Sequence, residues 1–123
     1  IEHDGEILIL HRQDHKPQGN TWAIVAGKVE EGEDFKEALL REISEEIGLD
    51  LSHTKPKIID SYFVRHGTYD FMYHTFHSML SMRPEICLNI KEHKDYQWVT
   101  PMDALSLELI QDEDYCIKEF YNI

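Results

Sequence analysis

Cysteines and long apolar segments are scarce in this chain, and each shortage excludes a class of protein. The 123 residues include only two cysteines, Cys87 and Cys116, which lie too far apart to form a C-x-x-C metal or redox motif. This cysteine usage is typical of a reduced protein, so we expect a cytoplasmic location. No apolar run approaches the roughly 18 residues of a membrane-spanning helix, so no membrane association is expected.

Positive charge is the second shortage. The chain has 12 Lys and Arg residues against 24 Asp and Glu residues, and its formal net charge is −12. A surface of this sign repels nucleic acid and anionic lipid, so neither is an expected partner. It also repels phosphorylated small molecules unless cations lie between the two. The sequence leaves the oligomeric state open, and a homodimer is compatible with it.

The hydrophobic pattern predicts the secondary structure. Strands are predicted over residues 6–12, 21–26, 57–66, 69–82 and 96–99, and residues 83–94 are expected to be irregular. Thr100 and Pro101 begin a short helix, and Asp112 is the expected cap of a last helix that ends at Tyr121. Strands and helices in this order predict a layered α/β fold, and the length fits a single domain over residues 1–123.

The segment 35–47 carries helix signals at both ends. Asp34 can cap the first turn, and Glu37 follows three residues later, as in a capping box. Gly48 provides a glycine stop after the last turn. The sequence therefore predicts one helix over this segment.

Three glutamates of this helix lie where a packing helix would carry apolar residues. Leu39 and Ile43 recur at helical spacing and predict the buried stripe. Glu42 and Glu46 fall inside or beside that stripe, and Glu45 flanks it. Burying unpaired carboxylates is unfavourable, and like charges four residues apart repel each other. A divalent cation that prefers oxygen ligands, Mg²⁺ or Mn²⁺, removes both problems, so a metal site is predicted rather than a solvated acidic face.

The same segment fits a longer pattern, G-x5-E-x7-R-E-U-x-E-E-x-G-U, in which U is a bulky apolar residue. Every fixed position is filled, by Gly27, Glu33, Arg41, Glu42, Ile43, Glu45, Glu46, Gly48 and Leu49. This segment resembles the Nudix box, and weaker similarity extends over nearly all of the chain. The resemblance implies a Nudix-type α/β/α sandwich with a mixed β-sheet between helices. Nudix chains usually carry apolar residues before the early strand, so we expect the first strand to be cut short at Ile1.

The resemblance also implies the chemistry. Members of the Nudix family hydrolyse the pyrophosphate link of a nucleoside diphosphate joined to another group X, with a divalent metal as cofactor. By this resemblance, Glu42, Glu45 and Glu46 hold the metal, together with the backbone carbonyl of Ala26. The residue that takes a proton from the attacking water stays open, with Glu42 and Glu45 as catalytic candidates within the box.

Further residues are expected to position the site. The resemblance pairs Arg41 with Glu33 as a supporting ion pair. Gly27 is expected to allow a backbone turn that a side chain would block. Arg12 and Lys28 are the cations expected to face the phosphates.

Three candidates lie outside the box. Glu92 matches, by its spacing before the late strand, a metal-binding or catalytic acid of some relatives, with Asp95 and Glu85 as weaker alternatives. Trp22 and Tyr73 are candidates for lining a nucleotide base pocket, although packing on the sheet is the better explanation for Trp22.

The box indicates the reaction and leaves X open. Markers of dinucleoside polyphosphate, ADP-ribose and coenzyme A hydrolases are absent, so we expect a nucleoside or deoxynucleoside triphosphate pyrophosphohydrolase resembling MutT. A dinucleoside polyphosphate or nucleotide-sugar hydrolase is the alternative substrate class. A non-catalytic nucleotide- or RNA-binding module of the same fold is the alternative of another class, and the complete box argues against it.

Overall fold

The computed structural model of the chain describes residues 1–25, 32–54, 56–66 and 69–123, with the backbone alone for residues 60–66 and 69–74. The strands are β1 (Glu2–His3), β2 (Glu6–Arg12), β3 (Trp22–Ala23), β4 (Lys57–His66), β5 (Tyr69–His77) and β6 (His93–Val99), and the helices are α1 (Phe35–Ile47), α2 (Pro101–Ala104) and α3 (Glu113–Tyr121). Within these described ranges, no helix is long and apolar enough to span a bilayer.

Strand β2 is the centre of the main sheet. β6 pairs with it antiparallel along nearly its whole length, from Ile7 opposite Val99 to Arg12 opposite His93. β1 and β3 share the other edge of β2 and are also antiparallel to it. Residues 7–10 of β2 are all buried, which is expected of a strand that is covered on both faces.

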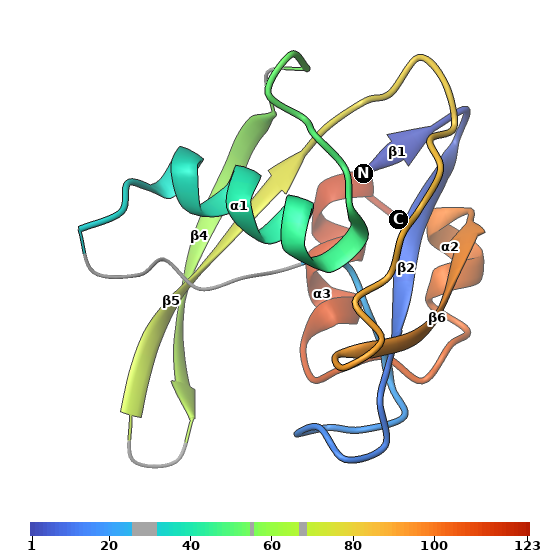
Figure 1. Cartoon of the computed structure of the whole chain (residues 1–123). Coiled ribbons are helices and arrows are strands. Elements are labelled where there is room, and N and C mark those ends of the chain that lie inside the picture. Colours follow the sequence, from blue (N-terminus) through green and yellow to red (C-terminus); the bar gives the residue numbers. More distant parts are fainter. Residues whose placement is uncertain (26–31, 55, 67–68) are drawn as a thin grey trace.

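Strands β4 and β5 form the predicted antiparallel hairpin, which Figure 1 shows beside the main sheet. The chain leaving β5 then joins β1. The Glu2 N–H donates to the Ser78 carbonyl at 2.9 Å, and the Leu80 N–H donates to the Glu2 carbonyl at 2.8 Å. This contact is parallel, with Glu2 opposite Met79, so the strand arrangement as a whole is mixed.

Helices pack on both faces of β2. Leu8 and Leu10 belong to one core, which contains the buried apolar residues of α1. Ile7 and Ile9 belong to a second core, which contains Ile117 of α3 and a buried alanine of α2. Alternate residues of one strand therefore contact different helices, and the predicted α/β/α sandwich is confirmed (Figure 1).

Both ends of α1 are formed as the sequence predicts. The Asp34 carboxylate accepts a hydrogen bond from the Glu37 N–H at 2.8 Å. Gly48 adopts the left-handed conformation, with φ 68°, and its N–H donates to the Ser44 carbonyl. A Cβ on Gly48 would lie 2.9 Å from the Cβ of Cys87, so both conformation and space favour glycine here.

Two predicted strand boundaries are wrong, because backbone groups in these segments form hydrogen bonds with other parts of the chain. Within the described residues of the 21–26 segment, only Trp22 and Ala23 form a strand, since the Ile24 N–H donates to the buried Glu113 carboxylate instead. β5 ends at His77 rather than at residue 82, since the following residues pair with β1.

Two further expectations are corrected at the other end of the chain. β6 begins at His93 rather than at residue 96, because β2 is long enough to pair with it. Asp112 precedes α3 as predicted but makes no side-chain capping bond, since its backbone is left-handed with φ 68°.

Candidate active site

The three box glutamates occupy one side of α1 next to its buried stripe. The side chains of Glu42 and Glu46 are only 16% and 13% exposed, whereas that of Glu45 is 56% exposed. Ile43 and Ile47, in the same turns, are fully buried against β2. The amphipathic pattern of the helix therefore carries two carboxylates to the edge of the core, where few water molecules can solvate them.

Arg41 is the cation among these carboxylates. Its Nε and one terminal nitrogen donate to the two oxygens of Glu33, at 2.7 and 3.0 Å. Its other terminal nitrogen donates to Glu42 at 3.0 Å and to Glu45 at 3.2 Å. One guanidinium thus contacts three carboxylates and joins the loop before α1 to the side of the helix that carries the glutamates.

Burial raises the pKa of Glu42 above its ordinary value. Hydrogen bonding and attraction from Arg41 oppose this shift, and repulsion from Glu45 and Glu46 adds to it. The net direction shows that the positive charge of Arg41 does not fully compensate Glu42. A carboxylate in this condition is stabilised by a further cation.

A loop fixed to the end of α1 carries a residue that the sequence did not single out. The Cys87 N–H donates to the Ile47 carbonyl at 2.9 Å, and the Asn89 N–H donates to the Glu46 carbonyl at 3.0 Å. The loop ends at His93, which is 8% exposed. Its Nδ1 lies 3.1 Å from Oε2 of Glu46. Eight histidines scattered through the sequence gave no signal for this one, because the contact depends on how the loop folds back.

Glu92, the adjacent candidate, has a different partner. Its carboxylate lies 2.6 Å from Nζ of Lys16. The hydrogen bond from Lys16 lowers the pKa of Glu92, although partial burial opposes the shift. Its backbone also holds the loop after β2, since its carbonyl accepts from the Gln13 N–H at 3.0 Å. A carboxylate with a lowered pKa is a weaker proton acceptor, so the structure gives Glu92 no advantage as the base.

The remaining candidates are distributed as follows. Nε of Arg12 donates to the Pro17 carbonyl at 2.9 Å and so holds the loop after β2. Trp22 is buried in the core beside α3 and stacks on His11, with ring centroids 4.2 Å apart, so packing accounts for it. Ala26, Gly27, Lys28 and the side chain of Tyr73 lie outside what the structure describes.

The donor chemistry of α1 fits a hard divalent cation. All three glutamates offer oxygen ligands, and Glu42 is desolvated. Within the described residues, no three His, Cys, Asp or Glu side chains already converge on one point that could hold a metal. The Arg41 guanidinium lies beside Glu42 and Glu45.

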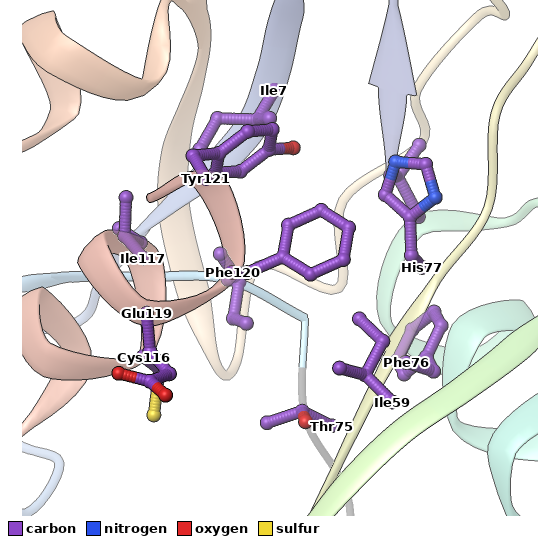
Figure 2. Close-up of a pocket in the computed structure, with 12 residues that line it drawn as sticks. Ile7, Ile59, Thr75, Phe76, His77, Cys116, Ile117, Glu119, Phe120 and Tyr121 are labelled. Atoms are coloured by element: carbon purple, nitrogen blue, oxygen red, sulfur yellow. The ribbon is translucent and has the colours of Figure 1, made fainter. Parts of the chain in front are cut away.

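A cavity of about 340 Å³ lies away from these glutamates. Figure 2 shows side chains of α3, such as Cys116, Ile117 and Phe120, on one side and Thr75, Phe76 and His77 on the other. Its described lining includes no residue of α1. The cavity and the carboxylates of α1 are therefore separate features.

Known proteins resemble the chain in both sequence and fold. The profile of the NUDIX domain family matches residues 1–120. The chain is 31% identical over 111 residues to the CTP pyrophosphohydrolase of Escherichia coli K12, covering 89% of this chain and 77% of that protein. It is 34% identical over 119 residues to the nucleoside triphosphatase NudI of the same organism, covering 89% and 83%. A MutT protein of Methanosarcina mazei has a similar fold, with a TM-score of 0.79 and 23% identity over 98% of this chain and 86% of that one.

The chain therefore belongs to the NUDIX domain family. The matches confirm the predicted MutT-like relationship and the predicted fold. They also confirm the predicted class of enzyme, a Nudix pyrophosphohydrolase.

Proposed function

We propose that the chain is a divalent-metal-dependent hydrolase of nucleoside or deoxynucleoside triphosphates, cleaving within the triphosphate to release pyrophosphate. The observation that carries this proposal is the group of three carboxylates on one side of α1, two of them mostly buried. The names of the two sequence relatives, a CTP pyrophosphohydrolase and a nucleoside triphosphatase, support the choice of substrate class. Dinucleoside polyphosphates and nucleotide sugars are the alternative substrates.

In this proposal, Glu42, Glu45 and Glu46 hold Mg²⁺ or Mn²⁺, with the backbone carbonyl of Ala26 as a further ligand. The cation, when bound, supplies charge neutralisation at the phosphate oxygens and lowers the pKa of a coordinated water. It also allows a protein of net charge −12 to accept an anionic substrate.

The residues around the carboxylates have distinct proposed roles. Arg41 holds Glu33 with two hydrogen bonds and so fixes the start of α1 relative to the glutamates. In the metal-free chain the pKa of Glu42 is raised and that of Glu92 is lowered, so Glu42 stays a candidate for the base beside Glu45.

Three proposed assignments rest on the sequence alone. Arg12 and Lys28 face the phosphates, and Gly27 allows the turn into the loop before α1. The cytoplasmic location likewise stays a prediction of the sequence.

The test is hydrolysis by the purified chain across a panel of nucleoside triphosphates, dinucleoside polyphosphates and nucleotide sugars, with products identified. We expect turnover with Mg²⁺ or Mn²⁺, none with EDTA, and a nucleoside monophosphate with pyrophosphate as products. Glu45→Gln and Glu46→Gln should each reduce turnover by about 100-fold or more. Glu37→Gln, on the exposed side of the same helix, is the matched control and should leave turnover unchanged.

Failure of this test has a defined meaning. If nucleotides bind but none is cleaved with any divalent cation, the chain is a binding module and the enzymatic proposal is wrong. If Glu45→Gln and Glu46→Gln both keep normal turnover, the assignment of the metal to α1 is wrong.

A further inference from the structure

Glu46 and His93 meet in a buried position where one polar atom of each lacks a hydrogen bond to any described residue. Oε2 of Glu46 and Nδ1 of His93 are both buried and lie 3.1 Å apart. The distance suits a hydrogen bond, but the angles do not, and among the described residues neither atom has another hydrogen-bond partner. A buried polar atom left in this state destabilises the fold. A hydrogen bond between the two atoms would satisfy both at once.

The backbone on both sides holds the two residues in register. The Glu46 carbonyl accepts from the Asn89 N–H at 3.0 Å, and the Asn89 carbonyl accepts from the His93 N–H at 3.0 Å. His93 is also the first residue of β6, opposite Arg12 of β2. The contact thus joins the last turn of α1 to the central sheet, and the backbone of both residues is held by hydrogen bonds.

Glu46 also differs from the other two glutamates of the box in its partner. Arg41 donates to Glu42 and to Glu45, and these bonds limit the positions of their oxygens. The described contacts of the Glu46 side chain include His93 and do not include Arg41. The neighbour of Glu46 is therefore the imidazole ring of His93, whereas the neighbour of Glu42 and Glu45 is the guanidinium of Arg41.

We propose that His93 is a positioning residue for Glu46: its Nδ1–H donates to Oε2 and fixes the orientation in which the carboxylate would hold a cation. This inference rests on the proposed function, in which Glu46 is a metal ligand. An ionised carboxylate can only accept hydrogen bonds, so the ring supplies the proton through its Nδ1–H tautomer. Donors of this kind fix the orientation of a ligating carboxylate, and their loss typically weakens metal binding by about 10- to 100-fold.

The test compares two substitutions that separate donation from packing. His93→Asn keeps an N–H donor near the position of Nδ1, whereas His93→Leu keeps the bulk and removes the donor. Binding of Mn²⁺ alone, without nucleotide, is measured by the loss of the free-ion electron paramagnetic resonance signal. Urea unfolding in EDTA records the stability of each variant. Should His93→Leu fail to fold, His93→Met serves as the donor-free variant.

A matched control comes from a second His–Glu contact. Nε2 of His77 lies 3.1 Å from Oε1 of Glu2, remote from α1 in the sequence and without contact to its glutamates among the described residues. His77→Leu removes a similar donor, so it should change stability and leave Mn²⁺ affinity unchanged.

We expect His93→Leu to weaken Mn²⁺ binding by about 10- to 100-fold and His93→Asn by less than about threefold. Equal affinity in His93→Leu and the wild type would show that His93 only fills space, and the inference alone would fail. An Asn variant as weak as the Leu variant would overturn donation as the mechanism. If the wild-type protein binds no Mn²⁺, the metal assignment of the proposed function fails, and this inference fails with it.

Discussion

Replacing Arg41 by Met tests whether one guanidinium organises the carboxylates around α1. The substitution keeps the apolar stem and removes the charge that contacts Glu33, Glu42 and Glu45. Two hydrogen bonds join Arg41 to Glu33, and both side chains are at least three-quarters buried, at 25% and 15% exposure. We therefore expect the coupling energy of this pair to lie between two limits. An exposed ion pair contributes about 0.2–1 kcal/mol, and breaking a fully buried one costs about 3–5 kcal/mol.

The expected coupling between Arg41 and Glu33 is about 2 kcal/mol. It is measured by urea unfolding of the wild type, Arg41→Met, Glu33→Gln and the double variant, all in EDTA. Lys118→Met is the matched control, because the ion pair between Lys118 and Asp114 is half exposed at a distance of 3.6 Å. Breaking this pair should lower the free energy of unfolding by less than about 1 kcal/mol. A coupling energy below about 0.5 kcal/mol would refute the reasoning, because the pair would then behave as if it were in water.

Three further predictions concern single positions. Gly48→Ala should lower the free energy of unfolding by about 1 kcal/mol or more, since φ is positive and the new Cβ meets Cys87. Gly32→Ala is the control: φ is also positive, at 80°, but the space is open, so the free energy of unfolding should fall by less. The folded-state pKa of Glu42 is raised, so its ionisation destabilises the metal-free fold as pH rises through that pKa. The Glu42→Gln variant should therefore be more stable than the wild type at pH 7 but not at pH 3. An equal gain in stability at both pH values would contradict this. Glu92→Gln should lower the maximal rate by less than about tenfold, since Lys16 already lowers its pKa, and a larger loss with unchanged KM would make Glu92 the base.

Local signals in the sequence were sufficient for the elements whose stability depends on neighbouring residues. The cap at Asp34, the glycine at position 48 and the apolar stripe between them predicted α1 to its observed bounds, since capping and helical periodicity act within a few residues. The same pattern predicts that Glu42 and Glu46 lie at the edge of the core, and the nine filled positions of the box are sufficient to indicate the family.

Contacts between distant parts of the chain decided the rest. Glu113 ends β3 by taking the Ile24 N–H, and the chain after β5 leaves its hairpin to pair with Glu2, because each backbone group bonds to whichever partner the fold brings near. For the same reason, spacing before the late strand selected Glu92, whereas the fold places its neighbour His93 against Glu46 and pairs Glu92 with Lys16. The sequence by itself determined the box, the helix that carries it and the class of chemistry. Only the tertiary structure decided which side chains contact that helix, since such contacts depend on where separate loops meet.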